Sequence, residues 1–302
     1  MSSDPIYTFH ASAIALGGVV NNPSRTMIPS LASVALAPTG GLGTTVVTSY
    51  DRDGVRFDTA YSAVRGEMIA EDVYSTVAEV AIDNLTVFDT LHVDALRASV
   101  RSRRDLNGDD DAEITFHAEY AGLFVNDFEI APQLDLELFE KAPTYEKFLA
   151  EVTEVNWGLR KKAKKCYRER FEWRDGDVPS PGALANRPVR ASVARSFVAK
   201  PKLPCCTGYT LSIPKFGRIR LGEVVLKPGQ RRLSLLQIDF NKKEGFNRFD
   251  GGSTGETEGV QRQVQAFALE SHDSDTTSTG PHSGTITIAS VEGNGTPIWP
   301  KN

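Results

Sequence analysis

The strongest constraint on the fold is a repeated alternation between Val73 and Arg101. In an extended chain, successive side chains point to opposite faces. One face of residues 73–82 therefore carries Tyr74, Thr76, Ala78, Val80 and Ile82. Residues 91–98 repeat the alternation after a bend near Asn84–Thr90. Val, Ile, Thr and Tyr pack well on a pleated surface, because they are stiff or bulky close to the backbone. Both runs are therefore predicted to be strands.

Similar short runs, separated by turn signals, recur along most of the chain. Asn107-Gly108 and Pro228-Gly229 are typical of tight turns, because Gly accepts a positive φ and Pro presets the turn angle. This rhythm predicts a mainly β protein, an antiparallel β-sandwich or barrel-like sheets with one helical insertion. Strands are expected at 7–20, 44–50, 55–64, 113–120, 123–130, 134–139, 189–198, 208–213, 218–226, 232–240, 260–269 and 285–291.

Glycine and proline mark the expected interruptions. Gly17-Gly18 predicts a turn or a bulge at the end of the first strand, and residues 21–29 predict a loop. Glu292–Gly295 is expected to end the last strand. No repeat of fixed period is present, so a regular solenoid or propeller is not supported.

One stretch breaks the strand rhythm. Apolar residues recur at spacings of three and four from Phe148 to Ala163, which predicts a helix over residues 144–173. The chain is therefore divided into an N-terminal β-rich lobe (1–142), a basic amphipathic helix insertion (143–176) and a C-terminal β-rich lobe (177–302). The two lobes are either separate or parts of one continuous domain.

The predicted helix carries a strongly basic face, for which two interpretations are open. It is either the solvated side of a helix whose apolar stripe packs on the sheet, or a docking surface for an anionic partner such as nucleic acid, phospholipid or an acidic protein. The basic residues are Arg160, Lys161, Lys162, Lys164, Lys165 and Arg168.

Composition excludes several classes of protein. With 40% hydrophobic and 24% charged residues among 302, the chain does not match a globally disordered protein. A net charge of −5 gives no overall attraction to nucleic acid. No run approaches the roughly 18 apolar residues of a membrane helix, and Met1–Pro5 lacks the basic start of a signal peptide.

The three cysteines (Cys166, Cys205 and Cys206) form no disulfide framework and suit a reducing compartment. The expected location is cytoplasmic, or exported without a classical signal peptide.

Three groups of segments carry a family resemblance. The first is Gly40–Thr44, leading through Ser75–Leu85 to Asp94–Ser99, and the second is Ala121–Asn126. The third is Gly217–Glu223, followed by Leu233–Ile238. In that order they resemble the bacterial choice-of-anchor P type domain and its uncharacterised soluble relatives. The resemblance implies a β-rich fold, often found on surface-associated bacterial proteins, and assigns no catalytic residue.

An acidic run after the second central strand is a candidate cation site. Asp105, Asn107, Asp109 and Asp111 offer oxygen ligands at alternate positions, which hard cations such as calcium prefer. An EF-hand register fails, because its twelfth position is Phe116 instead of a bidentate Glu. The alternative is a solvated hairpin turn.

On balance the sequence assigns no enzyme activity. Zinc-protease and phosphate-loop patterns are absent. Cys205-Cys206 has neither C-x-x-C spacing nor a nearby His, so an inert thiol pair is expected. No catalytic, cofactor-binding or metal-binding residue and no cofactor is therefore predicted. His10, His92 and His117 remain candidates for a site that only folding would assemble.

The function predicted from these features is structural. A non-enzymatic β-scaffold is expected to self-assemble into a homo-oligomer or to bind a protein partner, because the edge strands of open sheets leave unpaired N–H and C=O groups. One alternative is a carbohydrate- or small-ligand-binding module that uses Trp299, Tyr61 or Phe246. The other alternative is a hydrolase whose site residues, with His10, His92 or His117 among them, are brought together only by folding.

Overall fold

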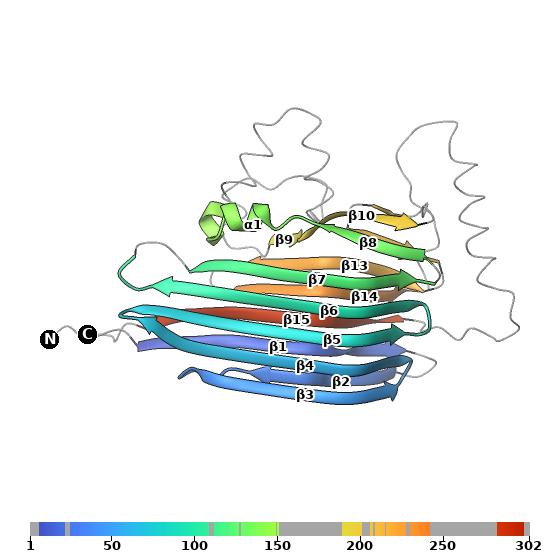
Figure 1. The fold of residues 1–302 in the computed structure, drawn as a ribbon, viewed down its shortest axis with the longest axis horizontal. Helices are drawn as coiled ribbons and strands as arrows, with labels where there is room; N and C mark the ends of the chain where they lie inside the picture. The colour runs from blue at the N-terminus through green and yellow to red at the C-terminus, as the bar shows by residue number, and fades with distance from the viewer. Residues whose placement is uncertain are drawn as a thin grey trace, which may run out of the picture.

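The chain folds into two antiparallel β-sheets that lie face to face (Figure 1). The computed structural model describes residues 6–21, 25–108, 112–126, 128–148, 150, 189–200, 206–207, 209–214, 216–227, 230–241 and 283–298. Sheet A has the order β11-β12-β13-β14-β15-β1-β2, and β9 also pairs with β13; sheet B has the order β10-β8-β7-β6-β5-β4-β3. The predicted mainly β, sandwich-like fold is thus confirmed.

The strands of sheet B are formed mostly by consecutive hairpins. They are β3 (Gly41–Arg52), β4 (Val55–Ala70), β5 (Val73–Val87), β6 (Leu91–Asp105), β7 (Glu113–Val125), β8 (Phe128–Leu134) and β10 (Ala194–Lys200). Sheet A contains β1 (Ile6–Asn21), β2 (Arg25–Ala35), β9 (Val189–Ser192), β11 (Cys206–Thr207), β12 (Thr210–Ile213), β13 (Gly217–Lys227), β14 (Gln230–Asn241) and β15 (Ser283–Ile298).

Sheet A joins strands from the beginning and the end of the chain. The first strand, β1, pairs along its length with the last, β15, from Ile6 opposite Ile298 to Asn21 opposite Ser283. Strands of both predicted lobes therefore share one sheet. The predicted helix from residue 151 onward, with its basic residues, lies outside the described residues, as do Cys166, Cys205 and the strand predicted at 260–269.

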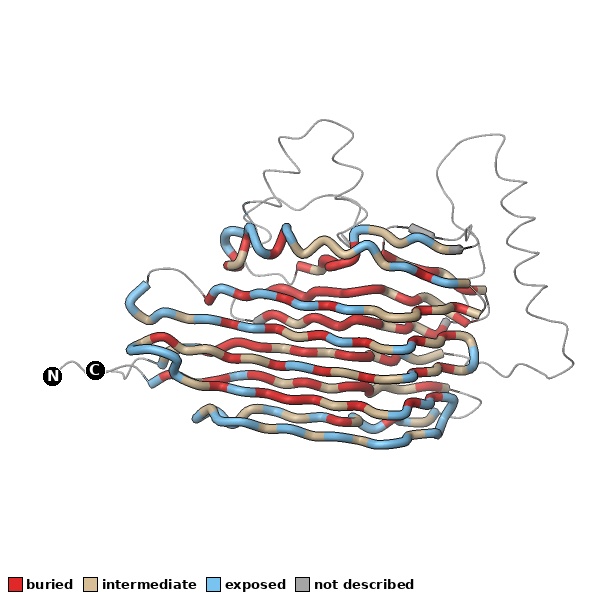
Figure 2. Tube along the Cα trace, viewed as in Figure 1, coloured by how far each residue is buried: buried red, intermediate tan, exposed pale blue. Residues whose placement is uncertain are grey.

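The core is the apolar layer between the two sheets (Figure 2). Alternate residues of strands such as β5 and β6 point into it over most of their length, and the central strands β1 and β15 pack across β4, β5 and β6. Burial of these side chains is the main favourable contribution to folding. Fully buried members include Phe57, Ile82, Leu96, Val100, Leu221, Leu236 and Ile288.

A row of kinks crosses sheet B. Ser49, Asn84 and Gly122, on alternate strands β3, β5 and β7, have φ values of 55°, 55° and 55°. The strands between them place Asp58 and Asp94 in the same row, because the pairings on either side are interrupted there. The Asn84 side-chain amide donates to Asp58 Oδ2 at 2.6 Å. We call these five residues the sheet B kink row.

Sheet A carries a matching row. Ala32, Ala289 and Gly222 have φ values of 44°, 51° and 61°. Ala15 and Leu235 lie between them on β1 and β14, again where the pairing is interrupted. We call these five residues the sheet A kink row.

Each kink row reverses which residues face the core. In β5 the even-numbered residues from Thr76 to Ile82 are buried, whereas beyond Asn84 the odd-numbered Leu85 and Val87 are buried. In β6 the change falls between Val93 and Leu96. In β5 the left-handed residue Asn84 breaks the two-residue period, as a bulge does, and in β6 the break falls at Asp94, between Asn84 and Gly122 of the neighbouring strands. The 15-residue strands β5 and β6 are therefore each two short segments that meet at the kink row.

The kink at Gly222 anchors the crossover between the two sheets. The chain passes from β9 in sheet A to β10 in sheet B at Val193, whose N–H donates to Gly222 O at 2.9 Å. Ser192 Oγ donates to Leu221 O at 2.6 Å and accepts from the Ala194 N–H at 2.9 Å. The predicted single strand 189–198 is thus two strands in different sheets.

A short helix replaces one predicted strand. Residues 134–139 were expected to be extended, but α1 spans Glu137–Lys141. Glu137 lies in its first turn and forms an ion pair with Lys141 in its last turn, which suits the helix dipole. Phe139 is buried, with its ring 5.3 Å from that of Phe116 and 5.5 Å from that of Phe148. Burial of this aromatic cluster at the end of the core favours a helix here over continued alternation.

The expected interruptions differ in part from those of the structure. Gly17-Gly18 marks a shift of register against β2, which confirms the bulge alternative, and β1 continues beyond it to Asn21. The predicted loop 21–29 is shorter, because β2 begins at Arg25. Glu292–Gly295 does not end the last strand, which continues to Ile298. Gly293 instead leaves room for Val100 of the facing sheet, and Gly295 leaves room for the Tyr7 ring of the neighbouring strand β1.

Tyr120 connects β7 of sheet B to the sheet A kink row across the core. Its hydroxyl, on β7 of sheet B, donates to the carbonyl of Leu235 in the sheet A kink row at 2.7 Å. We expect Tyr120→Phe to lower the free energy of unfolding by about 1–2 kcal/mol, because the buried carbonyl loses its donor. Urea unfolding at neutral pH measures the difference. A loss no larger than that of Tyr61→Phe, on the outer face of β4, would contradict this role.

The wild type and Tyr120→Phe can also be compared at different pH values. Burial raises the pKa of the Tyr120 hydroxyl above its ordinary value of 10.0. Below pH 10.0 the phenol is protonated in both the folded and the unfolded chain, and its contribution to stability is complete. As the pH rises above this value, the unfolded chain ionises first and the contribution is lost. The stability gap between wild type and Tyr120→Phe is therefore expected to narrow in urea unfolding above pH 10.0.

Candidate functional site: an open sheet edge

The strand β3 forms an open edge of sheet B. One side of it pairs with β4 from Gly41 to Arg52, and no described strand pairs with its other side. An edge strand presents a row of N–H and C=O groups that another strand can use. Thr44–Thr48 is rich in β-branched residues, which favour the extended conformation that such pairing needs.

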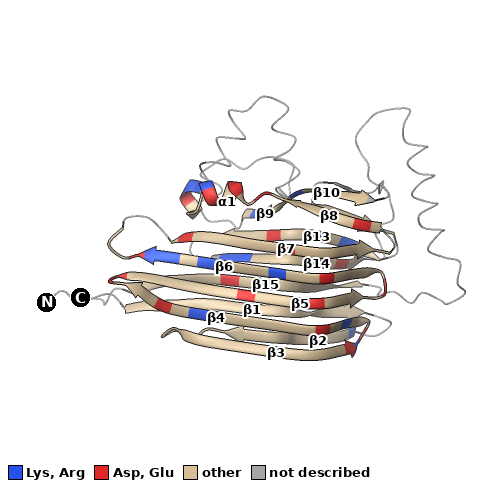
Figure 3. Cartoon of the chain, in the orientation of Figure 1, with Lys and Arg blue, Asp and Glu red and all other residues tan. Residues whose placement is uncertain are grey.

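The residues of β3 lack the features that usually block an edge. Gly41–Tyr50 contains no charged residue and no proline, and charge appears only at Asp51 and Arg52 (Figure 3). Two apolar side chains on its outer face, Leu42 and Val46, are 74% and 56% exposed. Lysines, prolines, bulges and short length are the common protections of edge strands. The N-terminal part of β3 has none of them.

The neighbouring edge of sheet A differs. The strand β2 packs beside β3 across the sandwich (Figure 1). It contains Pro29, which has no N–H to donate, and it is irregular at the bulge opposite Leu16–Gly18 and at Ala32. Of the two adjacent edges, β3 is therefore the one suited to accept a strand.

The three candidate histidines are not brought together. His10 lies on β1 in sheet A, where its Nε2 is 3.0 Å from Glu292 Oε1. His92 and His117 lie on the adjacent strands β6 and β7 of sheet B, but His92 is opposite Phe124, seven residues beyond His117. That offset is about 23 Å along the strands. The three histidines therefore do not converge on one site.

His92 has local polar partners. Its Nδ1 lies 3.3 Å from Thr86 Oγ1 and its Nε2 lies 3.0 Å from Asp94 Oδ1. The His92 and Asp94 side chains are 43% and 57% exposed on the outer face of sheet B. Water solvates both groups there. The contacts connect β5 with β6 beside the kink row and do not support a catalytic role for His92.

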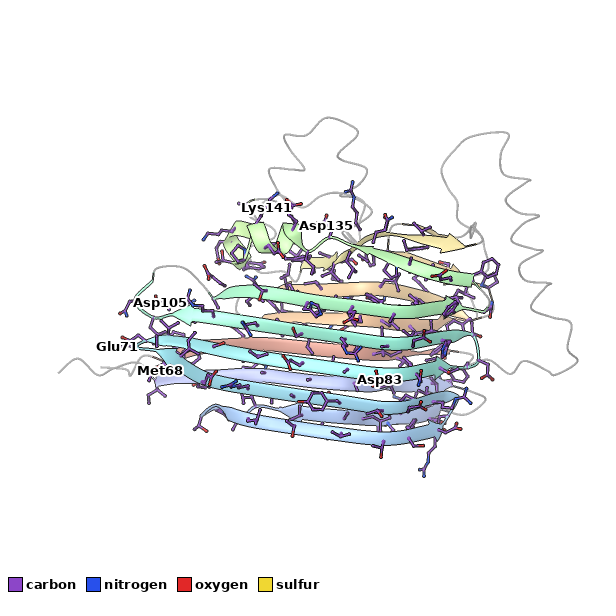
Figure 4. All side chains as sticks on the ribbon, in the orientation of Figure 1. Met68, Glu71, Asp83, Asp105, Asp135 and Lys141 are labelled. Atoms are coloured by element: carbon purple, nitrogen blue, oxygen red, sulfur yellow. The ribbon has the colours of Figure 1, made fainter. Side chains whose placement is uncertain are left out.

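The candidate cation site is only partly described. The Asp105 carboxylate accepts from the Asn107 backbone N–H at 2.9 Å, and the Asn107 amide donates to Asp72 Oδ2 at 3.3 Å. Glu71 and Asp105 lie at the same end of the sandwich (Figure 4). Asp109 and Asp111 lie outside the described residues. Among the residues the structure describes, no group of three or more His, Cys, Asp or Glu side chains could hold a metal ion.

Of the three aromatic candidates for ligand binding, the structure describes only one. Tyr61 lies on the outer face of β4, between Val46 and Ala81 of the neighbouring strands. Phe246 and Trp299 lie outside the described residues. Cys206 begins β11. No helix among the described residues is long and apolar enough to cross a membrane.

Sequence reasoning expected an edge strand but did not identify β3 as the open one. The sequence signal was the absence of charge from Gly41 to Tyr50, which differs from the charge-bearing runs 55–70 and 91–105. Only the strand order shows that this run lies at an edge and not in the middle of a sheet.

Comparison with known proteins places the chain in a family. A family model described as "Domain of unknown function (DUF8256)" matches residues 7–227, more than half of the chain. The chain belongs to this family. No curated protein and no solved structure matches it. The residues matched to DUF8256 include β1 to β13, and thus the whole of β3. The resemblance to the choice-of-anchor P type domain stays a prediction.

Proposed function

We propose that this DUF8256 protein is a non-enzymatic β-scaffold that associates with another chain by adding a strand to the edge of β3. The observation that carries the proposal is an uncharged, regular segment of an edge strand, Leu42–Thr48, with no described partner on its outer side. Strand addition uses main-chain hydrogen bonds for affinity and alternate side-chain positions for specificity. Both requirements are met along Leu42–Thr48.

The side chains of the edge support this mode of association. An added strand would bury part of the exposed apolar surface of Leu42 and Val46. Each buried apolar Å² contributes roughly 25 cal/mol to the free energy of association. Thr44 and Thr48 alternate with them on the same exposed face. This face would favour an extended partner with uncharged, β-branched residues at matching positions.

A peptide-binding experiment tests the edge directly. The probe is a short fluorescein-labelled Thr-Val repeat peptide with terminal lysines for solubility, titrated with the protein and followed by fluorescence anisotropy. We expect saturable binding to the wild-type chain. We expect binding to be lost in Thr44→Lys/Val46→Lys, because charged side chains on an edge strand oppose strand addition.

The matched control replaces an exposed apolar residue of the other edge. Met27 on β2 is 72% exposed, and Met27→Lys introduces the same kind of charge without altering β3. Peptide binding by Met27→Lys should equal that of the wild type. Binding that survives Thr44→Lys/Val46→Lys, or that is absent from the wild type, would reject β3 as an acceptor of strands.

A further inference from the structure

We infer that the strand added to β3 is the β3 strand of a second copy of this chain, paired antiparallel about a two-fold axis at Thr45. The inference rests on the proposed function, since it names the partner of the same edge. The kinks of β3 and the distribution of charge along it carry the argument.

The kinks fix how much of β3 can pair. Gly40 and Gly41 have φ values of 85° and 108°, and Ser49 has a φ of 55°. Regular antiparallel pairing needs extended backbone, so Ser49 interrupts it, and the two positive-φ glycines mark where the ladder with β4 begins. The uninterrupted part of the edge is Leu42–Thr48, and its central residue is Thr45.

The faces of the sheet fix the symmetry. If the outer faces of the two copies lie on the same side of a continuous sheet, directly opposed residues must both be outward or both be inward. An antiparallel two-fold pair therefore has its axis at a residue and not between two residues. Placing the axis at Thr45 uses the whole regular segment of both copies.

This register is self-complementary. It opposes Leu42 with Thr48 and Thr44 with Val46 on the outer face, and Gly43 with Val47 on the inner side. The four kinds of pair, with Thr45 opposite itself, contain no charge. Pairs of β-branched residues are favourable across antiparallel strands, and like charges directly opposed are unfavourable. The charged residues of β3, Asp51 and Arg52, lie beyond the paired segment.

Only sheet B is continued in such a dimer. Pro29 and the irregular backbone at Ala32 prevent β2 from forming a matching ladder in sheet A. The interface is therefore a single antiparallel pair formed by the two β3 strands, and it leaves no further copy of this edge free. The expected product is a discrete dimer and not a fibre, because a two-fold interface uses the same patch on both copies.

Two charged double variants test the partner and the register together. In Thr44→Glu/Val46→Lys, the register about Thr45 opposes each Glu to a Lys of the other copy, so the dimer should persist and weaken with added salt. If the axis were instead at Thr44 or Val46, the same variant would oppose Glu to Glu or Lys to Lys. In Thr44→Lys/Val46→Lys, like charges meet in all three registers, and association should weaken by roughly 30-fold.

Sedimentation velocity of the full chain at increasing micromolar concentration gives the readout, with circular dichroism to show that each variant is folded. The predicted result is a dimer for the wild type and Thr44→Glu/Val46→Lys, and a monomer for Thr44→Lys/Val46→Lys. A monomeric Thr44→Glu/Val46→Lys beside a dimeric wild type would overturn the register. A monomeric wild type would overturn the second copy as partner. In that case the Thr-Val peptide decides separately whether β3 accepts a strand.

Discussion

Gly222→Ala is expected to lower the free energy of unfolding by about 3 kcal/mol. Gly222 has a φ of 61°, a left-handed conformation that costs a residue with a Cβ roughly 1–2 kcal/mol. A Cβ added here would also lie 2.5 Å from Val193 Cγ2 and 3.3 Å from the Ala194 backbone nitrogen. Crowding of a packed core costs a further 1–3 kcal/mol or so. Urea unfolding of the two proteins measures the loss.

Gly41→Ala is the matched control for this substitution. Gly41 also has a positive φ, 108°, but an added Cβ would have no neighbour within 4 Å. It should lose only the conformational part, on the order of 1 kcal/mol. Equal losses for the two variants would show that contact between the Val193 crossover and the kink of β13 is not what requires glycine at 222.

Arg190→Met is expected to cost about 3 kcal/mol, and more than Glu223→Met. Arg190 Nη1 donates to both carboxylate oxygens of Glu223, at 3.2 Å and 3.0 Å. The Glu223 side chain is 1% exposed, whereas that of Arg190 is 37% exposed. Removing the arginine leaves a buried carboxylate without its cation, which is strongly unfavourable. Removing the glutamate leaves a guanidinium that water can still solvate, so the loss should be smaller.

The double variant Arg190→Met/Glu223→Met separates the ion pair from packing. Buried pairs replaced on both sides by apolar residues of similar volume often lose little stability. We therefore expect urea unfolding to show the double variant as more stable than Arg190→Met alone. A double variant as unstable as the single one would indicate that Arg190 acts through packing.

The presence of the strands followed from sequence, but their internal break did not. Period-two alternation predicted β5 and β6 correctly, because each segment of a half-buried strand keeps one face apolar. A continuous alternation from Leu91 to Ala98 was wrong, since Val93 and Leu96 are both buried and the strand pairing is interrupted at Asp94 between them. A positive φ at Asn84 has a sequence signal, because Asn tolerates it, but at Ala32 and Ala289 there is none.

The local sequence pattern does not predict the order of the strands in a sheet or which strands lie at its edges. The pairing of β1 with β15 joins residues 6–21 to 283–298, and nothing in either run specifies the other. The five-residue helix α1 was missed because alternate Leu134, Leu136 and Leu138 fit a strand equally well. Packing of Phe139 against Phe116 and Phe148 favours the helix. The open edge could be predicted as a type of site, but assigning it to β3 required the fold.

Hydrogen exchange of β3 at low and high protein concentration tests the central claim most directly. Strand addition would protect the backbone amides that point away from β4, while those of β2 serve as the internal reference. The account predicts that peptides covering residues 41–48 exchange more slowly as concentration rises in the wild type, and show no change in Thr44→Lys/Val46→Lys. Exchange of β3 that is independent of concentration in the wild type, even where the protein associates, would contradict it.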